Sequence, residues 1–191
     1  MIIGVTGPIS SGKGKVAELF RDEGFVHHSF SREIRAVARE RGIEINRKSL
    51  TRLGGELREE KPDGSVLGDL ILVKIEKELD KGVSRWVIEG MRRAEDANVF
   101  REHEFDNKKT RFVLIGVDAP VKERFERLKK RGRRGEPQTF DEFKKFDDQE
   151  MKEGGGQEVG KLMKMVDYLI VNDKGLEELK EKVEEIRKEI L

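Results

Sequence analysis

The segment GPISSGKGKVAELF, residues 7–20, constrains the fold of this chain more than any other. It follows the apolar run Ile2–Val5 and leads into a helical pattern whose apolar face starts at Val16. In such a strand–turn–helix unit, the backbone N–H groups of residues 10–15 and the positive end of the helix dipole favour an anion. The segment therefore predicts a phosphate-binding loop in which Lys13 reaches the β- and γ-phosphates. A purely structural turn with a solvated Lys13 is the alternative.

The loop departs from the pattern G-x-x-x-x-G-K-[ST] at its last position, where Gly14 replaces the hydroxyl residue and Lys15 follows. Adenylate kinases carry GKG at the same point, usually followed by Thr, and the chain resembles them there. The resemblance implies that Mg²⁺ is held mainly through water and other carboxylates. The predicted nucleotide-contacting residues of the loop are Gly7, Ser10, Ser11, Gly12, Lys13, Gly14 and Lys15.

Short apolar runs alternate with charged segments long enough to form helices, which predicts an α/β fold with a mainly parallel sheet. The five predicted strands are Ile2–Val5, Phe25–Phe30, Trp86–Ile88, Phe112–Val117 and Tyr168–Val171. Charged residues make up 41% of the chain, but the formal net charge is +1 and the apolar residues are clustered, so a globular protein is expected. Glycines bracket a polar stretch between the last two strands, which predicts a mobile excursion from the sheet.

Composition excludes several classes of protein. The chain has no Cys, which rules out disulfides, thiolate metal sites and a cysteine nucleophile. Its apolar runs are too short to span a bilayer, and no basic region precedes the first of them, so a cytoplasmic protein without membrane contact is predicted. The near-neutral charge gives no general attraction to nucleic acid. The charge-rich, Cys-free composition also indicates a thermophile.

Two adjacent arginines follow the third predicted strand in the stretch RWVIEGMRR. It resembles the D-G-x-x-R stretch of nucleoside monophosphate kinases, with Glu89 in place of Asp. The resemblance implies that Glu89 lies near Mg²⁺, through water, and that Arg92 or Arg93 binds the acceptor phosphate. Strictly counted, Arg93 fills the family's position, but both are retained. A strand cap and surface charge are the alternative reading.

Arginines also follow the second predicted strand. Arg35 matches the end of the family's G-D-x-x-R stretch, although the Gly-Asp pair is absent, and it is predicted to bind the acceptor. Arg58 is a further candidate for acceptor contact. His27 and His28 lie in the strand without acidic or Cys partners nearby in sequence, and no catalytic role is assigned to them.

The stretch after the fourth predicted strand places Val121, Phe125 and Leu128 on one helix face and arginines on an adjacent stripe. It resembles the R-L-x-x-R entrance to the lid of adenylate kinases, which points to Arg127 and Arg131 as cations around the transferring phosphoryl group. Arg124 lies on the same stripe, and Arg133 and Arg134 follow it. A solvated basic helix or an RNA-binding patch is the alternative.

The end of the chain, VDYLIVNDKGLEEL, resembles the last strand of dephospho-coenzyme A kinases, A-D-x-x-I-x-N-x-G. The resemblance implies that Asn172 lies beside the nucleotide base, while an ordinary turn residue is the alternative. The apolar stripe Leu176, Leu179, Val183, Ile186 and Ile190 predicts a helix packed on the sheet. A coiled-coil seam is the other interpretation, so a monomer or a homodimer is allowed.

Together these motifs resemble the P-loop nucleoside monophosphate kinase and dephospho-coenzyme A kinase superfamily, nearest to its archaeal dephospho-coenzyme A kinase-like members. The resemblance implies a three-layer α/β/α domain over residues 1–191, with an acceptor-binding insertion at about 31–82 and a lid at about 131–160. It implies ATP and Mg²⁺ as cofactors and a nucleotide-like acceptor. Phe146 departs from the family, which tends to have Arg there. An ATP-binding switch acting in RNA or ribosome assembly is the alternative function.

A guanine nucleotide switch is not expected. The pattern N-K-x-D is absent, since Lys109 and Thr110 follow the only Asn-Lys pair, and no Asp is followed three residues later by Gly.

Overall fold

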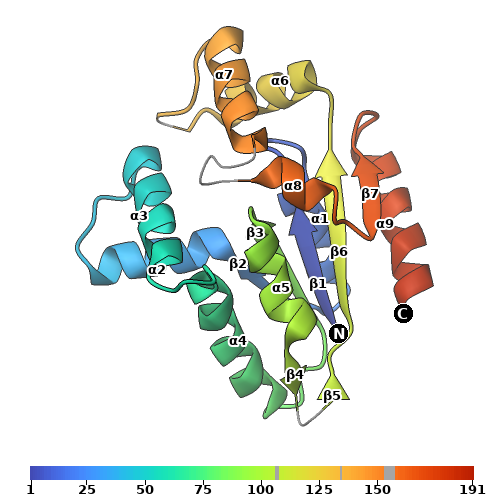
Figure 1. Cartoon of the computed structure of the whole chain (residues 1–191). Coiled ribbons are helices and arrows are strands. Elements are labelled where there is room, and N and C mark those ends of the chain that lie inside the picture. The colour runs from blue at the N-terminus through green and yellow to red at the C-terminus, as the bar shows by residue number, and fades with distance from the viewer. Residues whose placement is uncertain (106–107, 134, 153–157) are drawn as a thin grey trace.

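The five predicted strands form one sheet in the computed structural model, which describes residues 1–105, 108–133, 135–152 and 158–191. All strand pairs of this sheet are parallel, in the order β2-β3-β1-β6-β7 (Figure 1). Its strands are β1 (Ile2–Thr6), β2 (Val26–Ser29), β3 (Trp86–Met91), β6 (Phe112–Asp118) and β7 (Tyr168–Val171). The prediction of an α/β fold with a parallel sheet is thus confirmed.

The ends of the elements differ from the predicted ones in a few places. Strand β3 continues three residues beyond Ile88, because Gly90 adopts a φ of 90° that lets the strand bend and reach Met91. Strand β2 lies at an edge of the sheet, which accommodates its polar centre at His27 and His28. A short antiparallel pair, β4 (Glu104–Phe105) and β5 (Lys108–Lys109), was not predicted.

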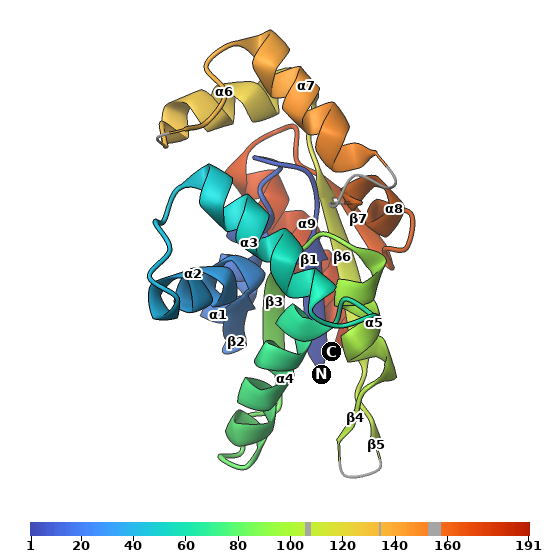
Figure 2. The same ribbon diagram turned by 60° about the vertical axis from the view of Figure 1, so that its left-hand side comes forward.

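Helices cover both faces of the sheet, which gives the predicted three layers (Figures 1 and 2). On one face, α1 (Lys13–Asp22) and α9 (Leu176–Ile190) pack through residues such as Phe20 and Val183. Of the predicted C-terminal stripe, only Leu176 is exposed, at 45%. The helix thus packs on the sheet, as predicted, from Leu179 onward.

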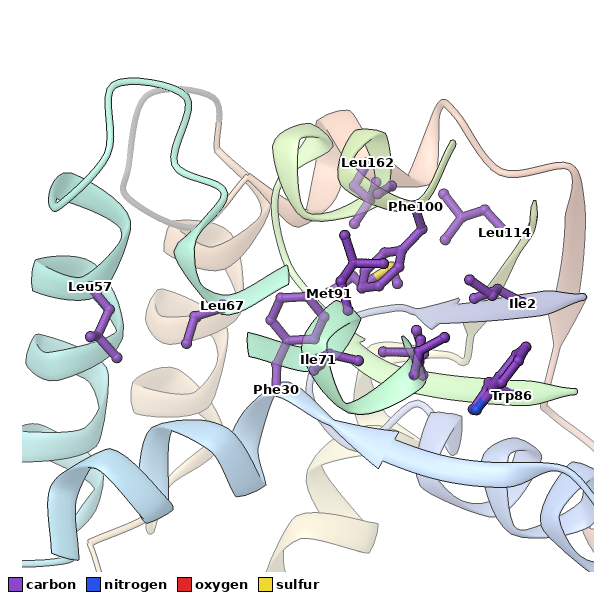
Figure 3. Packing of buried hydrophobic residues seen from close by; sticks show 14 of the residues in the cluster. Ile2, Phe30, Leu57, Leu67, Ile71, Trp86, Met91, Phe100, Leu114 and Leu162 are labelled. Atoms are coloured by element: carbon purple, nitrogen blue, oxygen red, sulfur yellow. The ribbon is translucent and has the colours of Figure 1, made fainter. Parts of the chain in front are cut away.

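The other face carries the larger hydrophobic cluster. Figure 3 shows Phe30, Ile71, Met91 and Phe100 packed together between strands and helices, with Leu162 above Phe100. The helices that contribute to this layer are α2 (Phe30–Glu40), α3 (Arg47–Glu59), α4 (Val66–Leu79), α5 (Ala94–Glu102) and α8 (Val159–Met163). The predicted acceptor-binding insertion, 31–82, contains α3, α4 and most of α2.

Two further helices, α6 (Val121–Arg131) and α7 (Phe140–Met151), lie over the glycine-loop end of the sheet, far from both termini (Figures 1 and 2). They form a small cluster of their own, in which Phe125 and Phe143 pack with Ile9 of the loop. The polar stretch for which a mobile excursion was predicted contains the helix α7, which begins with a capping box between Thr139 and Glu142. Arg134, which follows the predicted basic stripe, and the glycines within 153–157, which bracket the predicted excursion, lie outside the described residues.

Candidate functional site

The glycine loop joins β1 to α1 at the centre of the sheet. Gly7 has a φ of 147°, and a Cβ there would lie 2.1 Å from the carbonyl oxygen of Val117. Gly12 has a φ of 109°, and a Cβ there would lie 2.2 Å from Nδ2 of Asn172. Both positions therefore require glycine, for the backbone conformation and for the close approach of neighbouring segments.

Two serine side chains of the loop are suited to an anionic ligand. The hydroxyl groups of Ser10 and Ser11 are buried and have no hydrogen-bond partner among the described residues. A buried, unpaired hydroxyl costs free energy. A phosphate oxygen in this loop would offset that cost by accepting a hydrogen bond from the hydroxyl. The loop therefore fits the triphosphate of a nucleotide.

Lys13, the first residue of α1, lies at the mouth of this loop, and its Nζ donates a hydrogen bond to the carbonyl oxygen of Pro8 at 3.0 Å. Burial and the nearby charge of Arg92 lower the pKa of Lys13 to about 8, although Glu150 and Glu89 oppose the change. A bound phosphate would add negative charge and stabilise the protonated lysine. Lys13 is therefore placed to respond to an anion in the loop.

Glu89 is the carboxylate nearest to the position of the missing hydroxyl. Its Oε2 lies 3.3 Å from where a Cβ of Gly14 would stand, and its Oε1 lies 3.5 Å from Nε2 of His27. Burial raises the pKa of Glu89, but His27, Lys13 and Ser29 outweigh it and hold the pKa below its usual value. The carboxylate therefore stays ionised and fits the predicted contact with Mg²⁺ through water.

A cavity of about 960 Å³ opens beside the loop and gathers most of the predicted site. Its lining includes Gly12, Lys13 and Gly14 from the loop, with Ser10 and Glu89. The predicted arginines that line the same cavity are Arg35, Arg58, Arg92, Arg127 and Arg131. Phosphoryl transfer needs cations around the transferring group, and here four segments far apart in the sequence supply them.

Five predicted residues, Ser11 among them, do not line this cavity. Arg93 lines a second cavity of about 950 Å³, which borders the loop around Gly64, so the structure separates it from Arg92. Lys15 forms an ion pair of 2.9 Å with Glu18 on the surface of α1. Gly7 lies beneath the loop, against β6. Asn172 lies behind the loop, where its Nδ2 donates to the carbonyl oxygen of Ser11 at 2.8 Å.

The arginines of the large cavity differ in what holds them. Arg92 donates to Glu150 at 2.7 Å, and Arg131 donates to Glu136. Arg127 donates to the carbonyl oxygen of Asn172 at 2.8 Å.

Two other arginines have different roles in the structure. Arg58 is 5% exposed and is bound to Asp96 at 3.2 Å and to the carbonyl oxygen of Gly54. Arg35 donates to the carbonyl oxygen of Ser31 in its own helix and has no ion pair among the described residues. Arg35 is therefore the more available of the two for an anion, whereas Arg58 has a structural partner.

Several residues of the site were not predicted. Arg124, placed on the basic stripe, is instead buried and bound to Asp147 at 2.7 Å, so it holds α6 to α7. Arg47 lies on the ring of Phe146, and His27 beside Glu89. These contacts join segments that are far apart in the chain, and no local sequence pattern predicts such pairs. Only the unexpected Phe146 gave a signal, because an aromatic residue can take an arginine on its face.

The described residues contain no group of three or more His, Asp or Glu arranged to hold a metal ion. Within the same residues, no helix is both long and apolar enough to cross a bilayer.

The parallel sheet, the glycine loop and the cavity at its mouth define a protein with the fold of P-loop kinases. Similar solved structures include shikimate kinase from Acinetobacter baumannii in complex with shikimate, with a TM-score of 0.56 at 17% identity, covering 98% of this chain and 93% of that one. Dephospho-CoA kinase from Campylobacter jejuni has a TM-score of 0.54 at 16% identity, covering 99% of this chain and 96% of the other. At these identities the likeness concerns the fold alone.

Sequence comparison gives the family. A family model described as an AAA domain (AAA_17) matches residues 6–144. The UPF0200 protein PH1008 of Pyrococcus horikoshii is 35% identical over 191 residues, and TK1334 of Thermococcus kodakarensis is 32% identical over 191 residues; each alignment covers 100% of this chain and 98% of the relative. The chain therefore belongs to this AAA domain family and, with these archaeal relatives, to the UPF0200 proteins. Its thermophile-like composition fits them.

Proposed function

We propose that this protein transfers the γ-phosphoryl group of ATP, with Mg²⁺, to a nucleotide-like acceptor, either a nucleoside monophosphate or dephospho-coenzyme A. One observation carries the proposal. Lys13, half-buried at the head of the glycine loop, shares a cavity with Glu89 and with arginines from segments that precede and follow Glu89 in the sequence. Phosphoryl transfer depends on positioning and charge neutralisation more than on covalent chemistry, and this arrangement supplies both.

Each side chain has a role in this proposal. Lys13 and the loop hold the phosphates of the donor, while Arg127 and Arg131 neutralise the group in transit. Mg²⁺ supplies further neutralisation when bound, and Glu89 is the residue that would hold it, through water. Arg35 and Arg92 bind the acceptor phosphate, because a guanidinium can grip two phosphate oxygens at once.

The domain assignment belongs to the same proposal. Residues 31–82 would bind the acceptor, and residues 131–160 would cover the transferring group. Both segments contribute to the lining of the cavity, the first through Arg35 and the second through Arg131. Arg93 and Lys15 have no proposed contact with substrate, because neither lines this cavity.

The test is transfer from γ-labelled ATP with Mg²⁺ at elevated temperature. Dephospho-coenzyme A and each ribo- and deoxyribonucleoside monophosphate would be offered separately. Label in one acceptor establishes the kinase and identifies its substrate. If ATP binds but label stays on ATP or passes only to water, the proposal fails, and an ATP-binding switch becomes the better account.

A further inference from the structure

Two arginines from different helices that line the large cavity converge on one carboxylate. Arg131 ends α6 and donates to Oε1 of Glu136. Arg47 begins α3, and its NH1 lies 3.9 Å from the same oxygen. All three residues line the cavity beside the glycine loop. The carboxylate of Glu136 thus occupies a position that is enclosed by positive charge on two sides.

The partners of Glu136 leave half of its carboxylate unsatisfied. The residue is 8% exposed, and its Oε2 is buried without a hydrogen-bond partner among the described residues. A buried carboxylate oxygen without a donor is costly, so this contact is not the best one that the two guanidinium groups could make. A phosphate group offers more acceptor oxygens than a carboxylate does, and each of the two guanidinium groups can bind it in bidentate fashion.

Arg47 is held in place by its other contacts. Its guanidinium lies 3.9 Å from the centre of the Phe146 ring, on α7, which is within the range of a cation–π contact. Arg47 joins α3 to the segment from α6 to α7 through its contacts with Glu136 and with the Phe146 ring. Burial lowers the pKa of Arg47, and the charges of Arg92 and Arg131 add to that effect.

The same charges connect this site to the loop. Arg131 and Arg92 also lower the pKa of Lys13, which places the cations of the loop and of the cavity within electrostatic reach of one another. An anion that binds in the loop and extends into the cavity would therefore contact Arg131 and Arg47.

We propose that Arg47 and Arg131 form a single anion-binding site, in which Glu136 and a phosphate group of the ligand bind alternately. This inference rests on the proposed function, because it assigns the site to a phosphate beyond those held by the loop. Glu136 is a competitor for this site, and Phe146 positions Arg47 by supporting its guanidinium face. The aromatic residue that departs from related kinases thus supports an arginine contributed by another helix.

The test is the affinity of the full chain for inorganic pyrophosphate, measured by titration calorimetry without acceptor. Glu136→Gln removes the competing charge and should tighten binding about fivefold, which corresponds to about 1 kcal/mol of interaction between charges. Arg47→Met should weaken binding by about the same factor. In the double variant, the gain from Glu136→Gln should shrink, because one of the two released guanidinium groups is gone.

Matched controls separate a local site from general charge. Arg52→Met removes an exposed arginine from the same helix, and Glu126→Gln removes an exposed carboxylate from α6. Melting curves show whether each variant folds. If Glu136→Gln does not fold, the affinity of Arg47→Met for pyrophosphate alone tests the proposed site.

Two results would overturn the inference. One is an Arg47→Met variant that binds pyrophosphate like Arg52→Met, and the other is an equal gain from Glu136→Gln with and without Arg47. Because the assay requires no transfer, these results leave the kinase proposal standing. Conversely, if the variants bind pyrophosphate as expected but the protein transfers no phosphoryl group, the anion-binding site is supported and the proposed function is contradicted.

Discussion

The two sides of the large cavity are held together by different forces. On the glycine-loop side, the contacts are made to the backbone: Gly7 packs against the carbonyl group of Val117, and the side chain of Asn172 donates to the carbonyl oxygen of Ser11. On the side formed by α6 and α7, side chains make the joint, through the cluster around Phe125 and a buried ion pair between Arg124 and Asp147. The first side depends on the sheet, whereas the second depends on charges and a few aromatic rings.

This difference extends to the cations that face the cavity. Lys13 donates to a backbone carbonyl, whereas Arg92 and Arg131 are bound to the buried carboxylates of Glu150 and Glu136. An anion can therefore enter the loop without breaking an ion pair of Lys13, but the arginines must exchange or share their partners. We infer that the loop side is preformed and that the side formed by α6 and α7 adjusts to the ligand.

The largest effect is expected from breaking the ion pair that joins α6 to α7. Asp147→Ala leaves the buried Arg124 without its partner and should cost about 3–5 kcal/mol of unfolding free energy. Denaturant titration measures the loss. The neighbouring Asp148 is exposed, so Asp148→Ala should stay within about 0.5 kcal/mol of the parent. Equal losses in the two variants would show that the pair does not hold this side together.

On the loop side, Lys13→Ala should slow phosphoryl transfer at least ~10²-fold, because the lysine neutralises charge on the transferring group. Stability should change little by comparison, since the sheet supports the loop. Initial rates with the acceptor that the transfer assay identifies give the measurement. Lys180→Ala, on α9 far from the cavity, serves as control. An unchanged rate in Lys13→Ala removes the lysine from the mechanism.

Binding of ATP should depend on pH through Lys13, whose pKa is about 8. The charged form attracts phosphate, so affinity should be constant well below pH 8 and should fall as pH rises above it, by at most about tenfold per unit. Titrations at pH 7 to 9.5 test this. In Lys13→Arg the charge persists over the whole range, so its affinity should not fall; a parallel decline in both proteins would point to another group.

The smallest effect is expected from restoring the missing hydroxyl. Gly14→Ser places a Cβ 3.3 Å from Oε2 of Glu89, which must move by a few tenths of an ångström. Stability should change by only about 0.5 kcal/mol, since Ser is the better helix residue but the contact is tight. The concentration of Mg²⁺ that gives half-maximal transfer should decrease. Gly14→Ala adds the methyl group without the hydroxyl, and an identical response in both variants would exclude a role for the hydroxyl.

The sequence by itself determined the framework of this protein. The five apolar runs became the five strands of one parallel sheet, and the glycine loop follows the first strand as predicted. These features could be predicted because they depend on neighbours within a few residues: apolar periodicity, glycine at strained turns, and a helix start directly after the loop. The position of Lys13 at the end of the loop followed from the same local patterns, whereas a family resemblance pointed to Glu89, which lies within β3.

Only the tertiary structure decided which charged side chains share the cavity. It placed Arg92 in the cavity beside the loop and Arg93 in another, although they are adjacent in sequence. It also turned Arg124 into a structural residue and brought Arg47 onto Phe146, from a distant helix. Such pairs have no local signature, because a charged side chain on a helix looks the same in sequence whether it faces solvent, a buried partner or a ligand. Their roles are fixed by packing between distant segments.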